Sequence, residues 1–198
     1  MNTLARPGRY PVVTISLIAI SVAVTLLSNF SLVMPLIIGT PGSPLFSDIL
    51  AGEVWRLVTP MFLHLSFLHI LFNMMWLWDL GRIVELIKGW LFLLIFVLVT
   101  GVASNVAQYA ITQNPGFGGM SGVVYALLGY VWMQGKYNPR FGFELHKATV
   151  IMMLVWYVLC WTGMLGPIAN WAHTVGLLIG VAWGYLDRRP GRRAWISG

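Results

Sequence analysis

Hydrophobic residues form six long stretches, separated by short breaks that are polar or rich in glycine and proline. A bilayer has a hydrocarbon core about 30 Å thick, which about 20 apolar residues can cross as a helix. The pattern therefore predicts one all-α polytopic membrane domain covering residues 1–198. Its six transmembrane helices are predicted at approximately 11–28, 67–84, 89–111, 121–134, 148–165 and 169–186.

The third and fourth stretches lie in one run, residues 89–135, that contains no Asp, Glu, Lys or Arg. This run is too long for one crossing, and the proline and glycines of 113–119 break it into two helices. The second helix, 121–134, would be only about 21 Å long. Since charged sequence fixes its far end in water, its first residues are expected about 9 Å below the outer membrane surface. Loop backbone at that depth must be buried in protein or line a wet cavity.

Composition and charge placement support a membrane protein. Hydrophobic residues make up 58% of the chain and charged residues 9%, with a mean hydropathy of +0.79. The net charge of +6 could suggest nucleic acid, but 11 of the 12 basic residues fall on one side of the predicted spans, and only Arg56 falls on the other. The positive-inside rule then places both termini in the cytoplasm, with the lipid bilayer as the partner and no nucleic acid.

A serine framed by glycines lies in this apolar setting, at Ser121 within 118–122. A serine hydroxyl becomes a strong nucleophile when a neighbouring base takes its proton, and histidine is the usual base. His173, near the outer end of the last span, is on the same side as Ser121. An alternative is that His173 is a polar residue satisfied inside the bundle. Ionisable residues within a membrane are costly and usually functional, which favours a role as base.

Small residues at four-residue spacing would bring the two helices together. The last span carries three such glycines and the fourth span carries three small residues: Gly176, Gly180, Gly184, and Gly122, Ala126, Gly129. Packing along these residues places Ser121 and His173 at the same end.

No acidic residue is available to complete a triad. The acids on the outer side are Asp48 and Glu53, both in the long loop after the first span. The sequence therefore predicts a Ser-His dyad. Tyr125, one turn after Ser121, could pack against the imidazole, although ordinary interhelical packing explains its position equally well.

Two donors in the second span could stabilise an oxyanion. His69 and Asn73 are four residues apart and share a helix face. The backbone N–H of Ser121, at a helix start, would add a third donor. The alternative is that His69 and Asn73 form hydrogen bonds between helices.

These segments together resemble the rhomboid family of intramembrane serine proteases, in its compact bacterial six-helix form. The resemblance extends over nearly the whole chain and is carried by Glu53-Val54-Trp55-Arg56, His64, His69-Ile70-Leu71-Phe72-Asn73, Gly119-Met120-Ser121-Gly122 and Ala172-His173-Thr174-Val175-Gly176. It implies Ser121 as nucleophile and His173 as base.

The resemblance also implies supporting roles. His69, Asn73 and the Ser121 N–H would form the oxyanion hole, with Gly119 in the same motif and Tyr125 supporting the imidazole. Phe72 and Trp156 match bulky positions at the family's proposed lateral gate, with lipid-facing or core packing as the alternative.

The expected function is hydrolysis of peptide bonds in or near the transmembrane helices of membrane-protein substrates, in the bacterial inner membrane. No metal or organic cofactor is implied, since Asp, Glu, His and Cys are few and scattered. Two alternatives are a catalytically inactive rhomboid-like protein that binds membrane clients, and a transporter. An inactive relative would typically lack the serine or histidine, and a transporter would need polar residues along a continuous path. The sequence leaves the oligomeric state open.

Overall fold

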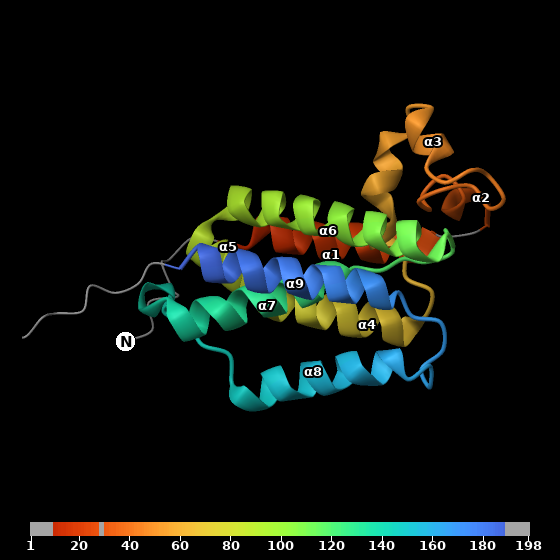
Figure 1. The fold of residues 1–198 in the computed structure, drawn as a ribbon. Helices are drawn as coiled ribbons and strands as arrows, with labels where there is room; N and C mark the ends of the chain where they lie inside the picture. Colours follow the sequence, from red (N-terminus) through yellow and green to blue (C-terminus); the bar gives the residue numbers. More distant parts are fainter. Residues whose placement is uncertain (1–9, 28–29, 189–198) are drawn as a thin grey trace, which may run out of the picture.

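A computed structural model describes residues 10–27 and 30–188, which are helical with no β-strand (Figure 1). This agrees with the predicted all-α class. Each of the six predicted stretches contains a long helix. The helices are α1 (Val12–Leu27), α4 (Phe67–Trp76) continued through a π-helical turn (Leu77–Gly81) into α5 (Arg82–Lys88), α6 (Trp90–Thr112), α7 (Ser121–Tyr137), α8 (Lys147–Trp161) and α9 (Asn170–Leu186).

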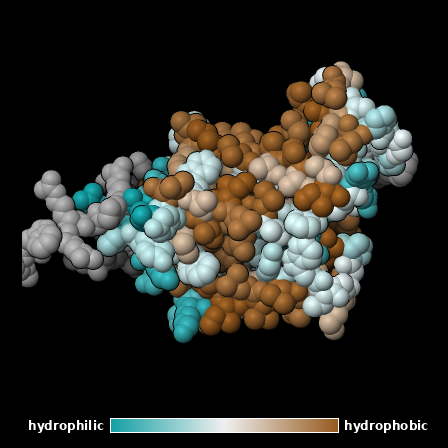
Figure 2. Space-filling view, viewed as in Figure 1, coloured by the Kyte–Doolittle hydropathy of each residue, from teal (hydrophilic) through white to brown (hydrophobic). Residues whose placement is uncertain are grey.

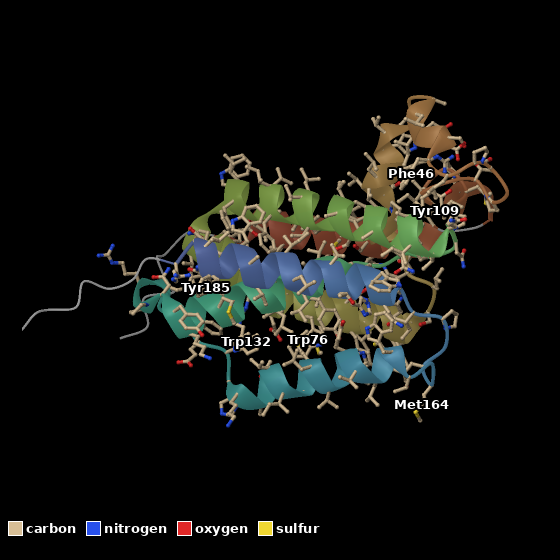
Figure 3. All side chains as sticks on the ribbon, viewed as in Figure 1. Phe46, Trp76, Tyr109, Trp132, Met164 and Tyr185 are labelled. Atoms are coloured by element: carbon tan, nitrogen blue, oxygen red, sulfur yellow. The ribbon has the colours of Figure 1, made fainter. Side chains whose placement is uncertain are left out.

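Short helical segments fill the connections. The long loop after α1 contains α2 (Phe30–Val33), α3 (Ser47–Leu50) and two 3-10 turns (Val54–Leu57 and Thr59–Phe62), and a third 3-10 turn (Pro139–Phe141) follows α7. The loop after α1 projects from one end of the bundle (Figure 1). Its Phe46 ring packs edge-on against Tyr109 of α6, with ring centroids 5.0 Å apart (Figure 3).

Three predicted helix ends need correction. Helix α7 ends at Tyr137 rather than at 134, because Gly135 is a point of close packing against the Phe143–Glu144 backbone and does not end the helix. The helix therefore spans roughly 26 Å, with the same first residue, Ser121, as predicted. Helix α8 ends at Trp161 rather than at 165, since Gly163 has a φ of +76°. Helix α5 runs on to Lys88, where Gly89 with a φ of +95° ends it.

The outer surface of the bundle is largely apolar. Figure 2 shows a hydrophobic band across the helices, and hydrophilic residues at the end where α5, α7 and α9 finish. Among the described residues, α6 alone is both long and apolar enough to cross a membrane by length and composition, and α1 and α8 are shorter apolar helices.

Helix α7 lies at the centre of the bundle and packs closely against α9, as the spacing of small residues predicted. A Cβ atom added at Gly176 would lie 2.0 Å from the carbonyl oxygen of Gly122, and one added at Gly180 would lie 2.0 Å from that of Ala126. At Gly184 the nearest atom would be the Tyr130 carbonyl oxygen, at 2.7 Å. Only glycine permits this approach of the two backbones.

We expect Gly180→Ala to destabilise the protein by roughly 1–3 kcal/mol, because the added methyl group meets backbone that cannot move aside without separating the helices. Helix propensity alone would favour alanine by about 1 kcal/mol, so a loss of stability isolates the packing effect. Thermal unfolding in detergent measures it, with Ala182→Val on the exposed side of α9 as the control. Equal melting temperatures for Gly180→Ala and the wild type would contradict the packing argument.

A buried carboxylate joins the start of α1 to the end of α5. The Glu85 side chain accepts hydrogen bonds from the Val13 and Thr14 backbone N–H groups, both at 2.8 Å, and from the Thr14 hydroxyl at 2.7 Å. These N–H groups belong to the first turn of α1, which has no intrahelical partners for them. Glu85 therefore caps α1 and fixes it against α5.

Candidate active site

The last residues of the loop before α7 pack against the protein and set where that helix starts. Gln113 ends α6 in a left-handed conformation, and Gly119 has a φ of +117°. The Gly119 N–H donates to the Pro60 carbonyl at 3.0 Å. A Cβ atom at Gly118 would lie 2.8 Å from the Leu63 side chain and carbonyl oxygen. The Gly118–Gly119 backbone is thus packed against the segment before α4, whereas Gln113, Asn114 and Gly116 are exposed.

Ser121 and His173 are brought together at the start of α7. The His173 Nε2 and Ser121 Oγ atoms are 2.8 Å apart, which is hydrogen-bonding distance. His173 is 5% exposed, whereas Ser121 is partly exposed. As the first residue of α7, Ser121 has a backbone N–H with no partner inside the helix. The Ser121 hydroxyl, the His173 imidazole and the N-terminus of α7 therefore lie together.

The Tyr125 ring lies against the His173 imidazole, with centroids 4.8 Å apart and planes tilted by 40°. Within the described part of the chain, His173 Nδ1 is buried and has no hydrogen-bond partner. Ring packing, rather than a hydrogen bond to Nδ1, thus restrains the imidazole. The Tyr125 hydroxyl donates to the Met153 carbonyl of α8 at 3.3 Å, which fixes the tyrosine in turn.

Gln108 of α6 holds the start of α9 and was missed by the sequence analysis. Its Oε1 atom accepts hydrogen bonds from the Trp171 and Ala172 backbone N–H groups, at 3.0 and 3.2 Å. These are first-turn groups that need a cap, and His173 follows directly. The sequence indicated only an amide side chain within the charge-free run 89–135, and the partners of that side chain depend on the tertiary fold.

His69 lies directly over Gly119: a Cβ atom added at Gly119 would lie 2.6 Å from the His69 Nε2 atom. The Asn73 amide donates one hydrogen bond to the His69 carbonyl at 2.8 Å. An asparagine NH₂ has two donors, so one remains for another acceptor. Sequence reasoning had both side chains donating into the site and did not foresee this bond along α4.

His64 supports the loop that carries Ser121. Its Nδ1 atom lies 3.2 Å from the Phe62 carbonyl, and its Nε2 atom accepts from the Met120 N–H at 3.4 Å. Burial, with a smaller contribution from His69, lowers the pKa of His64 to about 4. The ring is therefore neutral at pH 7 and can donate through Nδ1 while accepting through Nε2. The sequence offered His64 only as part of a resemblance.

Phe72 and Trp156 meet across α4 and α8, with ring centroids 6.1 Å apart. They are 45% and 48% exposed, so this contact lies at the surface of the bundle.

A small cavity of about 10 Å³ lies beside Ser121 and is lined in part by Ser104, Gly122 and Ala172. This is about the space that one water molecule needs.

The fold and site define a class: a helical bundle with an apolar exterior that carries a serine–histidine pair at a loop-to-helix junction. Comparison with known proteins agrees. A family model described as the Rhomboid domain matches residues 51–190. The chain belongs to the rhomboid family.

Curated relatives named rhomboid protease GlpG are similar over much of this chain. Those of Salmonella paratyphi A and Salmonella choleraesuis are 40% and 41% identical over 149 residues, which is 75% of this chain and 54% of each relative. The chain therefore spans about half the length of the curated relatives it matches. The matched range, residues 51–190, covers the position of every predicted site residue, from His69 to His173.

Proposed function

We propose that this chain is an intramembrane serine endopeptidase that uses Ser121 and His173 as a catalytic dyad. The observation that carries the proposal is the 2.8 Å contact between His173 Nε2 and Ser121 Oγ at the N-terminus of α7. Membership of the rhomboid family and the relatives named rhomboid protease support it. Proteins with transmembrane helices are the proposed substrates.

The chemistry follows from these positions. Ser121 Oγ attacks the carbonyl carbon of the scissile peptide while His173 Nε2 takes the hydroxyl proton. The oxyanion receives hydrogen bonds from the Ser121 N–H, His69 and the second Asn73 N–H. His173 then returns its proton to the leaving amine, which leaves an acyl group on Ser121. Water, activated by His173, hydrolyses this ester and regenerates the serine.

The dyad acts without a carboxylate in this proposal. Tyr125 packs on the imidazole and Gln108 fixes the start of its helix, so position is set by packing and by a backbone cap. Orientation of a base is a recognised part of its contribution to rate. No step requires a metal ion or an organic cofactor.

The chain is further proposed to cross the bacterial inner membrane six times, with both termini in the cytoplasm. The support is the placement of 11 of 12 basic residues on one side. The terminal segments 1–9 and 189–198 lie outside the described residues. The described basic residues of this group lie in α5, at the end of α7, in the 3-10 turn between α7 and α8, at the start of α8, and after α9.

We expect an alkaline phosphatase fused after Gly198 to be inactive in cells, because the enzyme folds only outside the cytoplasm. A fusion after Asn114, in the loop before α7, should be active and serves as the matched control. Phosphatase activity in intact cells, normalised to fusion protein level, measures both. An active fusion at Gly198 would contradict the six-span topology.

Substrate is proposed to enter sideways between α4 and α8, where Phe72 and Trp156 meet. We expect Trp156→Ala to raise the cleavage rate of a transmembrane substrate, because it removes a contact that holds the closed state and leaves the dyad untouched. If the contact between Phe72 and Trp156 is ordinary packing, the same change would lower stability without a gain in cleavage rate. Rate and melting temperature measured together separate the two, with Val158→Ala, exposed on α8 but outside this contact, as the control.

The function itself is tested by reconstituting the purified chain in liposomes with a model transmembrane substrate. The proposal requires cleavage in or near the substrate helix, located by mass spectrometry. Intact substrate after prolonged incubation with folded protein would favour the alternative of a client-binding rhomboid relative.

A further inference from the structure

Helix α8 lies at one edge of the bundle, and its buried residues fall on one face (Figure 1). Three residues at helical spacing on this face, Met153, Tyr157 and Cys160, make polar contacts with α7 and α9. The Met153 carbonyl accepts from the Tyr125 hydroxyl, and the Cys160 carbonyl accepts from the Asn170 amide at 3.1 Å. Within the part of the chain that the structure describes, Tyr157 is the one side chain of α8 that hydrogen-bonds another helix.

The direction of the Tyr157 hydrogen bond can be assigned. The Tyr157 and Thr174 hydroxyl oxygens are 2.8 Å apart. The Thr174 hydroxyl also donates its single proton to the Asn170 carbonyl at 2.8 Å, because a carbonyl can only accept. Tyr157 is therefore the donor and Thr174 the acceptor. Thr174 directly follows His173, so the bond from α8 reaches the turn of α9 that carries the proposed base.

The Tyr157 ring also contacts Tyr125, the residue that packs on the imidazole. The two tyrosine rings meet edge-on with centroids 5.7 Å apart, and the Tyr125 and His173 centroids are 4.8 Å apart. Contacts therefore run from His173 through Tyr125 to Tyr157. The hydroxyl bond to Thr174 and one peptide bond then close the circuit at His173. This circuit joins α7, α8 and α9 around the base.

We propose that Tyr157 is a positioning residue for the base, a role that rests on the proposed Ser-His dyad. His173 Nδ1 has no hydrogen-bond partner among the described residues, so the orientation of the ring depends on what packs around it. The Tyr157 ring supports Tyr125, and its hydroxyl fixes the first turn of α9 relative to α8. Together these contacts keep His173 Nε2 directed at the Ser121 hydroxyl, 2.8 Å away.

The competing explanation is that the hydroxyl bond only holds α8 to the bundle. Few residues of α8 are buried, and one hydrogen bond there could stabilise the fold without affecting the base. The two roles change different quantities. A packing role alters the melting temperature alone, whereas a positioning role alters the rate at which the proton moves from Ser121 to His173.

The test measures how fast a fluorophosphonate modifies Ser121 in the purified full chain, over a range of probe concentrations. Ser121 Oγ displaces fluoride from phosphorus while His173 takes the hydroxyl proton. The limiting rate constant, kinact, reports this step, and the half-saturating concentration, KI, reports probe binding. Tyr157→Phe removes only the hydroxyl. It should lower kinact about threefold at unchanged KI, the factor for one interhelical hydrogen bond of average strength in a membrane protein.

Matched variants test the acceptor. Thr174→Val removes the acceptor at nearly constant volume and should give the same kinact as Tyr157→Phe, whereas Thr174→Ser keeps the acceptor and should give the wild-type value. Both single changes break one bond, so the double variant should be no slower than either single variant. Tyr137→Phe, exposed at the end of α7, controls for the loss of a tyrosine hydroxyl.

Wild-type kinact in Tyr157→Phe, at any melting temperature, would assign the bond to packing and overturn the positioning role. A double variant slowed by the product of the two single effects would show that the hydroxyls act separately, and would overturn it as well. Absence of a Ser121 adduct in the wild type would instead contradict the dyad itself, so the two proposals fail in different ways.

Discussion

Ser121→Ala is expected to reduce cleavage of a transmembrane substrate by roughly 10⁶-fold, the loss typical of soluble serine proteases without their nucleophile. The side chain of Ser121 is the only proposed attacking group, and Oγ lies 2.8 Å from its base. Cleavage by purified protein in liposomes measures the effect. Ser21→Ala is the matched control and should cleave at the wild-type rate; Ser21 is buried in α1, and its hydroxyl has no hydrogen-bond partner among the described residues.

His173→Ala should cause a similar loss, because nucleophile and base act as one unit. The double variant is therefore expected to be no slower than either single variant. His146→Ala, a histidine at the start of α8, controls for removing an imidazole. A double variant that lost the product of the two single effects would contradict a coupled dyad.

The second large effect is expected at the proposed oxyanion hole. His69→Ala or Asn73→Ala should each lower kcat by about 10²–10³, equal to roughly 2.7–4 kcal/mol of transition-state stabilisation, with little change in KM. The donors act on a charge that exists only in the transition state, which is why binding should change little.

The competing reading of this pair is structural, since Asn73 also bonds the His69 carbonyl at 2.8 Å. If Asn73→Ala lowered the melting temperature and raised KM while kcat stayed at the wild-type value, His69 and Asn73 would be assigned a role in helix packing instead. Met75→Ala, exposed on the same helix, gives the baseline for shortening a side chain there.

Much of the fold could be predicted because membrane helices are encoded locally. Apolar stretches indicate where the helices lie. The glycines at four-residue spacing in α9, Gly176, Gly180 and Gly184, predicted its contact with α7. The helix ends were less certain because they depend on distant neighbours. Gly135 looked like a breaker in sequence, yet in the fold it lets the Phe143–Glu144 backbone pack against a continuing helix.

The candidate site, like the fold, was predictable where local sequence features determine it and not where contacts with distant residues do. Ser121 and His173 could be paired from residue type, predicted topology and small-residue spacing. Gln108 and His64 could not be assigned their contacts, because each bonds to backbone groups 56 to 64 residues away. The Asn73 bond to His69 was local but competes with the predicted role, and spacing alone cannot choose between two uses of one amide.

The central claim is that Ser121 is a nucleophile activated by His173, and covalent labelling tests it most directly. Purified protein is treated with a serine-directed fluorophosphonate, and the modified residue is located by peptide mass spectrometry. The account predicts a single adduct on Ser121 that is lost in His173→Ala. No adduct on Ser121 in folded wild-type protein, or equal labelling in His173→Ala, would contradict it.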